Sequence, residues 1–514
     1  MKLTNKLSST AISIAIVLSS ASLSAAEETL ISSPVSNYKT YSNYPVVEST
    51  GDSYSKFIER VLSPLYEPND PAYKDQRHWL PATNSDGFIG TNNILSSVQR
   101  LTPLRKPAIA YIDSGFYDHP DIIYRDGYSF TTMGHQEIGE NFFIQDEYNT
   151  PELRSYNCTV HGLAVAGIGG ATRDNGLAIA GISDADVVAI RGMYCGNGYL
   201  NDAFDSISWA LGNSIKGSRL PEVDIDVVNL SLGGQKPDCD VNHQAIFDEA
   251  NEKGIPLVIA VGNDQIDVAG FSPANCKGGI VVAAATIHGD LSPVSNYGEG
   301  IDIVALGDSI PSFTEIEEQI GYWDESSMAT PIVSGTIANA ISELGKFTIH
   351  ELKFFLSATA SAFAAGQCDD SLRCGAGILD AGDFIDSLRD YRAGNMLTLK
   401  SALGNAQLCD KSLYITDNDE LARLCETYEV ELPTIKSSRD DVRYEILEFP
   451  KGSPLAFENG SVFTTIDSSR LLISSLDFDT KDYGVRLCND ERCYGEEAIK
   501  ISKSQEDAPA ICND

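Results

Sequence analysis

The stretch Tyr322–Leu344 has the sequence YWDESSMATPIVSGTIANAISEL. It opens with polar residues and a Ser pair, and then becomes almost entirely small or apolar, with Pro331 near the start of a predicted helix, where a proline is tolerated. A helix with so few charges must be buried in a large core. Its positive end would favour a nucleophile whose attack creates an oxyanion. Taken alone, the stretch favours the plainer interpretation that Ser327 caps the helix.

The composition indicates an acidic protein with more than one domain. The 514 residues include 73 acidic and 37 basic side chains, a formal net charge of -36, and 42% hydrophobic residues. This length suits two or three domains with sizeable cores. The acidic excess argues against nucleic acid or an anionic membrane surface as a partner. It suits an exported protein that must stay soluble, although scattered acidic residues are also typical of any solvated surface.

Residues 1–26 have the pattern of a secretory signal peptide. Lys2 and Lys6 precede the apolar run AISIAIVL, and small residues follow, so that cleavage is expected after Ala26. No later segment is long and apolar enough to span a bilayer. We therefore expect a secreted protein without a membrane anchor, the alternative being that the N-terminal segment is retained as an anchor. The 11 cysteines then imply disulfides.

The chain between residues 67 and 390 alternates between two patterns. Continuous β-branched runs stand at 108–112, 186–191, 226–230, 256–261, 279–285 and 302–306. Helical patterns stand at His161–Ala171, Asn201–Gly212 and His243–Lys253. This alternation predicts an α/β domain, a parallel sheet with helices on both faces. In such sheets, active sites gather at the carboxyl ends of the strands.

The segments on either side of this domain differ from it. Residues 27–66 are polar and predict a pro-segment or flexible leader. At 396–514, short alternating runs such as 461–466, 470–476 and 497–502 predict a small all-β domain, a β-sandwich.

Four polar residues stand near the expected ends of strands and helices. Asp113 ends the strand AIAYI, and Asn263 follows the strand at 256–261. His161, one of only seven histidines, opens a helix of small residues. A serine nucleophile needs a base and an orienting carboxylate, and an amide can donate to an oxyanion. Each has a plain alternative, a turn residue for Asp113 and Asn263 and a buried core side chain for His161, but together with Ser327 they predict catalysis.

At these residues the chain resembles the subtilisin-like serine proteases. The matching motifs are IDSG at Asp113, HGLAVAG at His161, AVGND at Asn263, SMATP at Ser327, VVAIR at 187–191, NLSLGG at 229–234 and SNYG at 295–298. The resemblance covers Asn69–Asp386. It implies the subtilisin-like fold and a secreted endopeptidase that hydrolyses proteins and peptides through an acyl-enzyme, without a cofactor for catalysis.

The resemblance also implies the roles of individual residues. The catalytic triad would be Asp113, His161 and Ser327, and Asn263 would donate to the oxyanion. The substrate-binding residues would be Ser231, Leu232, Gly233, Gly234, Asp264 and Glu325. Family members often bind calcium, and here Asp121 and Gln76 match two of the usual ligands. The disulfides implied are Cys158–Cys195 and Cys239–Cys276, with Cys368–Cys374 as a short local pair.

The chain departs from the family pattern next to the nucleophile. The usual NGTS is replaced by DESS, so that Glu325 takes the position of a glycine and Asp324 precedes it. Leu163 and Ala164 replace a Thr and a second His that are not the base. With Asp264 nearby, we expect a negative rim and a tolerance or preference for basic or polar side chains before the cleaved bond. The alternative is that these carboxylates point to solvent.

The C-terminal segment leaves other functions open. The sequence LLISSLDFDTKDYGVRLC resembles the end of an immunoglobulin-like domain, with Arg486 in place of the usual Tyr. One alternative function is a protease-fold binding protein, inactive because Glu325 distorts the nucleophile turn. Another is adhesion or the binding of a surface or insoluble substrate by the C-terminal domain. We expect a monomer. The five C-terminal cysteines cannot all pair with one another.

Overall fold

The computed structural model describes residues 30–32, 66–82, 87–133, 138–143, 160–194, 196–314, 319–364, 368, 374–401, 427–435, 442–466, 468–474, 476–490 and 492–503. The expected signal peptide and most of the expected leader lie outside these residues, and so do Cys158 and Cys195. Among the helices described, none combines the length and the apolar character that a membrane span requires.

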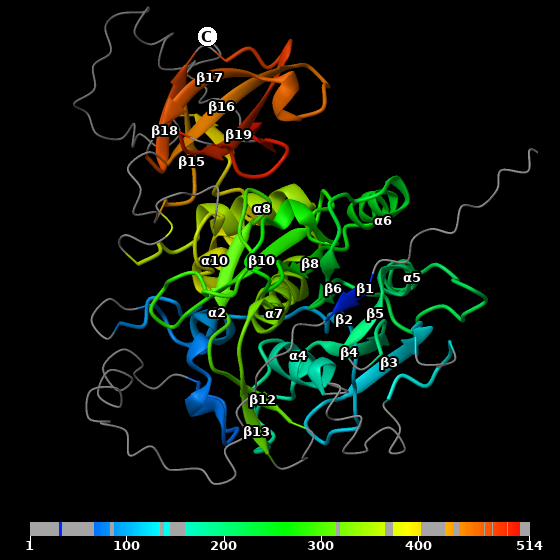
Figure 1. Ribbon diagram of the computed structural model, residues 1–514. Coiled ribbons are helices and arrows are strands. Elements are labelled where there is room, and N and C mark those ends of the chain that lie inside the picture. The colour runs from blue at the N-terminus through cyan, green and yellow to red at the C-terminus, as the bar shows by residue number, and fades with distance from the viewer. Residues whose placement is uncertain are drawn as a thin grey trace, which may run out of the picture.

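A seven-stranded sheet forms the centre of the larger domain (Figure 1). Its strand order is β11-β10-β8-β6-β2-β4-β3, and all neighbouring strands run parallel. The strands are β2 (Ala108–Asp113), β3 (Tyr124–Ser129), β4 (Asp186–Arg191), β6 (Val227–Leu230), β8 (Leu257–Ala260), β10 (Ile280–Ala285) and β11 (Ile303–Leu306). The parallel α/β sheet expected from the sequence is confirmed.

Helices cover both faces of the sheet because successive side chains of a strand point in opposite directions. In β2, Ile109 and Tyr111 belong to the hydrophobic cluster that includes α4 and α7, whereas Ala110 and Ile112 belong to the cluster that includes α5 and α6. The helices are α2 (Ile94–Gln99), α4 (His161–Gly170), α5 (Leu200–Ala210), α6 (Val241–Glu252), α7 (Ser326–Leu344), α8 (Ile349–Ala358) and α10 (Ala381–Arg392).

Short elements surround the main sheet. They form the antiparallel pairs β1–β5, β7–β9 and β12–β13. Their bounds are β1 (Leu30–Ser32), β5 (Asn197–Tyr199), β7 (Gly234–Gln235), β9 (Phe271–Ser272), β12 (Ile310–Phe313) and β13 (Ile320–Trp323). The 3-10 helices are η1 (Tyr73–Asp75), η2 (Arg77–Trp79), η5 (Val268–Gly270) and, in the C-terminal part, η6 (Phe457–Asn459).

Two four-stranded sheets make up the C-terminal part, with the orders β18-β15-β14-β21 and β17-β16-β19-β20. Neighbouring strands are antiparallel except for β14 and β21. The strands are β14 (Thr398–Ser401), β15 (Thr427–Glu431), β16 (Arg443–Pro450), β17 (Ser461–Ile466), β18 (Arg470–Ser474), β19 (Lys481–Cys488), β20 (Ile499–Lys500) and β21 (Ser502–Lys503). The all-β character expected here is confirmed.

The C-terminal sheets share apolar packing with the larger domain. Phe354 of α8 lies against Tyr444 of β16, with ring centroids 6.1 Å apart, and both belong to the cluster that covers one face of the central sheet. Arg486, which stands where an immunoglobulin-like domain usually has Tyr, donates instead to Glu445 Oε2 from Nε (3.0 Å) and Nη2 (2.7 Å). Cys488 and Cys493 form a disulfide in the same part.

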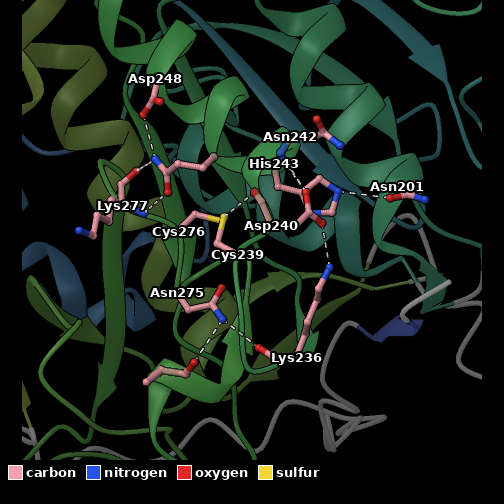
Figure 2. The surroundings of a disulfide bond; sticks show 12 residues. Asn201, Lys236, Cys239, Asp240, Asn242, His243, Asp248, Asn275, Cys276 and Lys277 are labelled. Atoms are coloured by element: carbon pink, nitrogen blue, oxygen red, sulfur yellow. Dashed lines mark hydrogen bonds and ion pairs between the residues drawn. A yellow bond between two sulfur atoms is a disulfide. The ribbon is translucent and has the colours of Figure 1, made fainter. Parts of the chain in front are cut away.

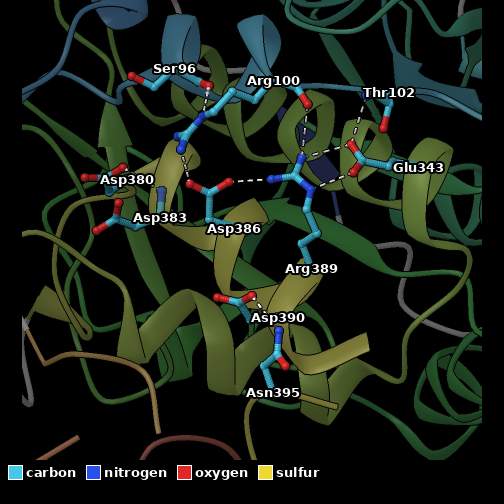
Figure 3. A network of polar contacts seen from close by, with 10 residues as sticks. All are labelled: Ser96, Arg100, Thr102, Glu343, Asp380, Asp383, Asp386, Arg389, Asp390 and Asn395. Atoms are coloured by element: carbon cyan, nitrogen blue, oxygen red, sulfur yellow. Dashed lines mark hydrogen bonds and ion pairs between the residues drawn. The ribbon is translucent and has the colours of Figure 1, made fainter. Parts of the chain in front are cut away.

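A network of charges ties the end of α7 to α10 and to the residues after α2 (Figure 3). Arg389 donates to both carboxylate oxygens of Glu343, over 2.6 and 3.0 Å, and the backbone N–H of Thr102 donates to Glu343 Oε2 over 3.0 Å. Asp386 lies between Arg389 and Arg100 and pairs with both. The helix that begins at the Ser pair is therefore anchored at its far end.

Candidate active site

Asp113 and His161 form a buried pair at the carboxyl edge of the sheet. Asp113 is the last residue of β2, and His161 is the first residue of α4. The imidazole Nδ1 lies 2.8 Å from Asp113 Oδ1, which also accepts from the backbone N–H of Ser114 over 2.6 Å. With a carboxylate at Nδ1, the imidazole carries its proton there and leaves Nε2 as the basic nitrogen. His161 Nε2 is buried and has no hydrogen-bond partner among the residues described.

Ser327 lies inside the first turn of α7 and does not cap it. The N-cap position belongs to Glu325, and no side chain accepts a hydrogen bond there, so the capping interpretation of Ser327 is wrong. The segment that leads into α7 passes beside the imidazole of His161, since the ring centroids of Trp323 and His161 are 6.3 Å apart. Ser327 Oγ donates to the carbonyl oxygen of Ser231 over 3.4 Å.

Pro331 leaves the backbone carbonyl of Ser327 without its usual helical hydrogen-bond donor. It is the sixth residue of α7 and therefore lies just beyond the first turn of the helix. In a helix the N–H of residue 331 would donate to the carbonyl of Ser327, and proline has no N–H. Ser231 Oγ donates to this carbonyl instead, over 2.8 Å. The proline therefore allows the candidate nucleophile to be joined to the loop after β6.

Buried side chains continue this connection into the core. Asn229 Nδ2 donates to Ser231 Oγ over 3.0 Å, and Ser334 Oγ donates to Asn229 Oδ1 over 2.9 Å. Ser231 is thus a support of Ser327 in addition to the substrate-binding role expected for it. The motif NLSLGG contained this signal, but the contact of Asn229 with α7 joins residues 105 positions apart and cannot be read from spacing.

Leu232, Gly233 and Gly234, three of the residues expected to bind substrate, form a tightly packed segment that we call the glycine-rich wall. Leu232 is buried. A Cβ on Gly233 would lie 2.3 Å from the ring of Phe271, so that only glycine fits there. Gly234 belongs to β7 and pairs with Ser272 of β9.

A disulfide braces this wall (Figure 2). It joins Cys239, after β7, to Cys276, after β9. The adjacent Asp240 caps α6 by accepting from the backbone N–H groups of Asn242 and His243, over 3.1 and 3.0 Å. Cys368 and Cys374 are also joined. Both pairs are those expected from the sequence, whereas Cys158–Cys195 falls outside the described residues and stays a prediction.

Asn263 lies in a turn after β8 that Asn296 holds in place. Asn296 Nδ2 donates to the carbonyl of Val261 over 2.8 Å, and its Oδ1 accepts from the backbone N–H of Asp264 over 2.8 Å. Gly262 has φ +96, and a Cβ there would lie 2.5 Å from Asn296 Nδ2. Asn296 is a positioning residue that sequence reasoning did not single out, although the motif SNYG contains it.

The side chain of Asn263 joins the two residues that precede Ser327. Its Oδ1 accepts from the backbone N–H of Ser326 over 3.0 Å and from Ser326 Oγ over 2.8 Å. Its Nδ2 donates to Glu325 Oε2 over 3.0 Å. The orientation of the amide follows from these partners, because a backbone N–H can only donate and a carboxylate oxygen accepts. The expected oxyanion donor therefore lies next to the nucleophile turn, bound to a carboxylate.

Glu325 adopts a backbone conformation that is normally reserved for glycine, with φ 92 and ψ 176. Its N–H donates to the carbonyl of Gly307 over 2.6 Å, which fixes the turn. Burial raises the pKa of its carboxyl group to about 7, His161 opposes this rise, and the charges of Asp324 and Asp264 add to it. The sequence left open that these carboxylates point to solvent. This holds for Asp264, which is exposed, whereas the carboxylate of Glu325 accepts a hydrogen bond from Asn263.

The N-terminal segment reaches the same region. In β1, Leu30 is opposite Tyr199, Ile31 opposite Gly198 and Ser32 opposite Asn197 of β5. Strand β1 also contacts β7, which begins three residues after Ser231. Figure 1 shows the dark blue arrow of β1 beside β5. Residues of the expected leader therefore lie as an added strand between β5 and the glycine-rich wall.

Asp121 and Gln76, the expected calcium ligands, both contact the loop before β4. Burial raises the pKa of Asp121 to about 7. Its two oxygens accept from Asn175 Nδ2 (2.7 Å) and from the N–H of Ile179 (3.2 Å), and the Gln76 amide pairs in both directions with the backbone of Ala180 over 2.8 Å. In this structure these oxygens therefore accept hydrogen bonds from N–H donors, and calcium binding by Asp121 and Gln76 stays a prediction.

Comparisons with known proteins agree on one family. The model of the Subtilase family matches residues 105–390. The chain is 31% identical over 365 residues to the extracellular basic protease of Dichelobacter nodosus, covering 64% of this chain and 58% of that protein. It is 31% identical over 344 residues to the extracellular protease of Xanthomonas campestris pv. campestris, covering 63% and 57%.

A solved protease structure from Pseudoalteromonas arctica shares the fold. It has a TM-score of 0.54 and 28% identity, and the match covers 63% of this chain and 100% of the other. The matched region spans less than two thirds of the length of the two curated relatives.

Proposed function

The chain belongs to the subtilase family, and on that premise we propose that it is an exported serine endopeptidase that acts on proteins or peptides through Asp113, His161 and Ser327. The observation that carries the proposal is the buried pair Asp113–His161. Its 2.8 Å contact leaves His161 Nε2 without a partner among the described residues, beside the segment that opens α7. The relatives that are named as proteases support an enzyme over an inactive binding protein.

The proposed reaction uses each group at a defined atom. His161 Nε2 takes the proton of Ser327 Oγ while that oxygen attacks the carbonyl carbon of the scissile bond. Asp113 holds the ring and stabilises the imidazolium that forms. Asn263 Nδ2 and the backbone N–H of Ser327 donate to the oxyanion. The imidazolium then protonates the leaving amine, and water, activated by the same imidazole, releases the acyl group from Ser327.

Hydrolysis by the processed, secreted protein tests this function. The wild-type protein should release fragments from a denatured protein substrate, and Ser327→Ala and His161→Ala should each reduce the rate by several orders of magnitude. Ser342→Ala is a matched control, since Ser342 also lies on α7 but its Oγ donates to the backbone carbonyl of Asn339, over 2.7 Å, and takes no part in the chain that supports Ser327. Equal activity in the wild type and in Ser327→Ala would refute the proposal.

We further propose that the leader keeps the enzyme inactive until it is removed. An extended peptide adds readily to an exposed strand edge, and β1 occupies the edge of β5 next to the glycine-rich wall. A substrate that approached this edge would have to displace Leu30–Ser32. A synthetic peptide of residues 27–36 should compete with substrate on the processed enzyme, whereas a scrambled peptide should not. Equal inhibition by both peptides, or by neither, would contradict this role.

A further inference from the structure

The carboxylate of Glu325 binds the side-chain amide of Asn263, which the proposed reaction needs. Asn263 has one side-chain nitrogen, and its Nδ2 donates to Glu325 Oε2 over 3.0 Å while its Oδ1 is held by Ser326. A substrate oxyanion has to take a hydrogen bond from the same Nδ2. Because an amide nitrogen carries two N–H groups, the oxyanion takes the second one, but it then shares Nδ2 with the Glu325 carboxylate and the two anions repel each other. A glycine at this position would not create that repulsion.

Two electrostatic effects of an ionised Glu325 oppose each other. Its charge would repel the developing oxyanion, and it would also stabilise the imidazolium of His161. The first effect should dominate, because Glu325 binds the oxyanion donor directly, whereas no hydrogen bond or ion pair joins it to His161 among the described residues. Charge interactions weaken with distance, and the oxyanion would lie on the same amide that Glu325 contacts, so its repulsion by Glu325 should be the stronger effect.

The described charged groups around Glu325 are mostly acidic. The charged groups that act on it are His161, Asp324 and Asp264, two of which are themselves acidic. No lysine or arginine forms an ion pair with Glu325 in the part of the chain that the structure describes. A positive group at this rim would therefore have to come from the substrate.

Building on the proposed function, we propose that Glu325 is a specificity-determining latch: its carboxylate holds Asn263 in the resting enzyme, and a cationic side chain next to the scissile bond releases the amide by pairing with Glu325. A lysine or arginine substrate thus completes the oxyanion site that it uses. A substrate with a neutral side chain at this position has to displace the Glu325 carboxylate from Asn263 and offers it no positive charge in exchange. The preference for basic side chains then results from the rate of the chemical step in addition to binding.

The latch also predicts a pH dependence. The carboxyl group of Glu325 has a pKa of about 7 because burial disfavours its charge. Below this pH the group is neutral and repels the oxyanion little, and above it the charge opposes turnover of neutral substrates. The ratio of the Glu325→Gln rate to the wild-type rate should therefore rise with pH through about 7.

The test uses matched peptides that carry Arg or Phe before the cleaved bond, with processed full-length enzyme. In Glu325→Gly and Glu325→Gln, kcat for the Phe peptide should rise about 10- to 100-fold, within the range that one oxyanion donor controls. The ratio of kcat/KM for the Arg peptide to that for the Phe peptide should fall. In an Asn263→Ala background, neither change at Glu325 should raise kcat for the Phe peptide.

Other outcomes would overturn the latch. If the Phe peptide is turned over no faster in both Glu325 variants, Glu325 does not restrain the donor. If the same gain persists in the Asn263→Ala background, the effect does not act through Asn263. If the wild type and all variants cleave neither peptide and no protein substrate is hydrolysed, the proposed function itself fails, and the latch fails with it.

Discussion

Asn263 and Glu325 lie 62 residues apart in sequence, and a hydrogen bond of 3.0 Å joins them. Glu325 stands two residues before Ser327, which we assign as the nucleophile. Glu325 makes this contact from a backbone conformation with positive φ, at a position where the family pattern predicts glycine. It links a strained backbone, a buried carboxylate and the expected oxyanion donor in one turn. Its cost to stability can be measured separately from its effect on the reaction.

Glu325→Gly should stabilise the protein. A residue other than glycine in this backbone conformation costs about 1–3 kcal/mol, and the buried carboxylate adds a pH-dependent penalty. Because burial raises the folded-state pKa of Glu325 to about 7, the ionised group favours unfolding, and the gain from its removal should grow from pH 5 towards pH 8. Thermal unfolding at several pH values measures both the cost of the backbone strain and the pH-dependent cost of the buried charge. Glu325→Ala is the control, since it removes the charge but keeps a Cβ at positive φ. Equal melting temperatures for the Gly and Ala variants would contradict the strain.

Asp113→Asn should abolish most activity while leaving the fold intact. The amide would no longer hold the proton on His161 Nδ1, and the same change in a Ser-His-Asp protease reduces kcat by about ten-thousand-fold. Peptide hydrolysis and circular dichroism would be measured together. Asp118→Asn, at a nearby exposed residue, serves as the control. A loss below about tenfold would exclude Asp113 from the mechanism.

Glu343→Gln should destabilise the protein at neutral pH. Burial raises the pKa of Glu343, but the hydrogen bonds from Arg389 and Thr102 outweigh burial, so that the pKa is lowered overall. The stabilisation is therefore complete above the ordinary carboxyl pKa of about 4.3 and is lost as the pH falls through the lower folded-state value.

Denaturant unfolding of wild type and Glu343→Gln from pH 7 to pH 3 measures this difference. Hydrogen bonds to charged groups contribute about 1.5–3 kcal/mol, and the difference should shrink at the acidic end. Glu252→Gln, at an exposed position of α6, should change little. A difference that is constant over this range would contradict the role of the Glu343 charge.

Removal of each of the two disulfides that the structure describes in the larger domain should have unequal effects. The bond Cys239–Cys276 spans 37 residues and Cys368–Cys374 spans 6. On the chain-entropy model the first contributes about 4 kcal/mol and the second about 2 kcal/mol. Unfolding of the two Cys→Ser double variants would show which loss is larger. A greater loss from the short loop would indicate that native-state contacts, rather than chain entropy, determine the contribution.

Sequence reasoning located the central strands because their side chains are buried on both faces. The run at 186–191 is the strand Asp186–Arg191 without change. Four of the other five expected strands differ by one residue at one end, and the run at 256–261 differs by one residue at each end. Strand β3 was missed because Tyr124–Ser129 begins with a partly exposed and an exposed residue and contains Gly127. A Cβ on Gly127 would lie 2.3 Å from the ring of Phe142, and local sequence does not reveal that contact.

The motifs also placed the candidate site residues, but not the contacts between them. Asp113 and His161 were expected as a pair, and they are 2.8 Å apart. The support of Ser327 by Ser231 depends on the acceptor that Pro331 frees, and the pairing of Leu30–Ser32 with β5 joins segments more than 160 residues apart. Such contacts depend on tertiary packing, which has no period along the sequence.

A fluorophosphonate probe tests the central claim most directly, because it reacts with a serine only when a base and an oxyanion site activate that serine. The processed protein would be labelled, digested and mapped by mass spectrometry. We predict one labelled position, Ser327, with labelling lost in Ser327→Ala and strongly reduced in His161→Ala. A correctly processed wild-type protein that takes up no label, or that is labelled at a serine other than Ser327, would contradict the assignment.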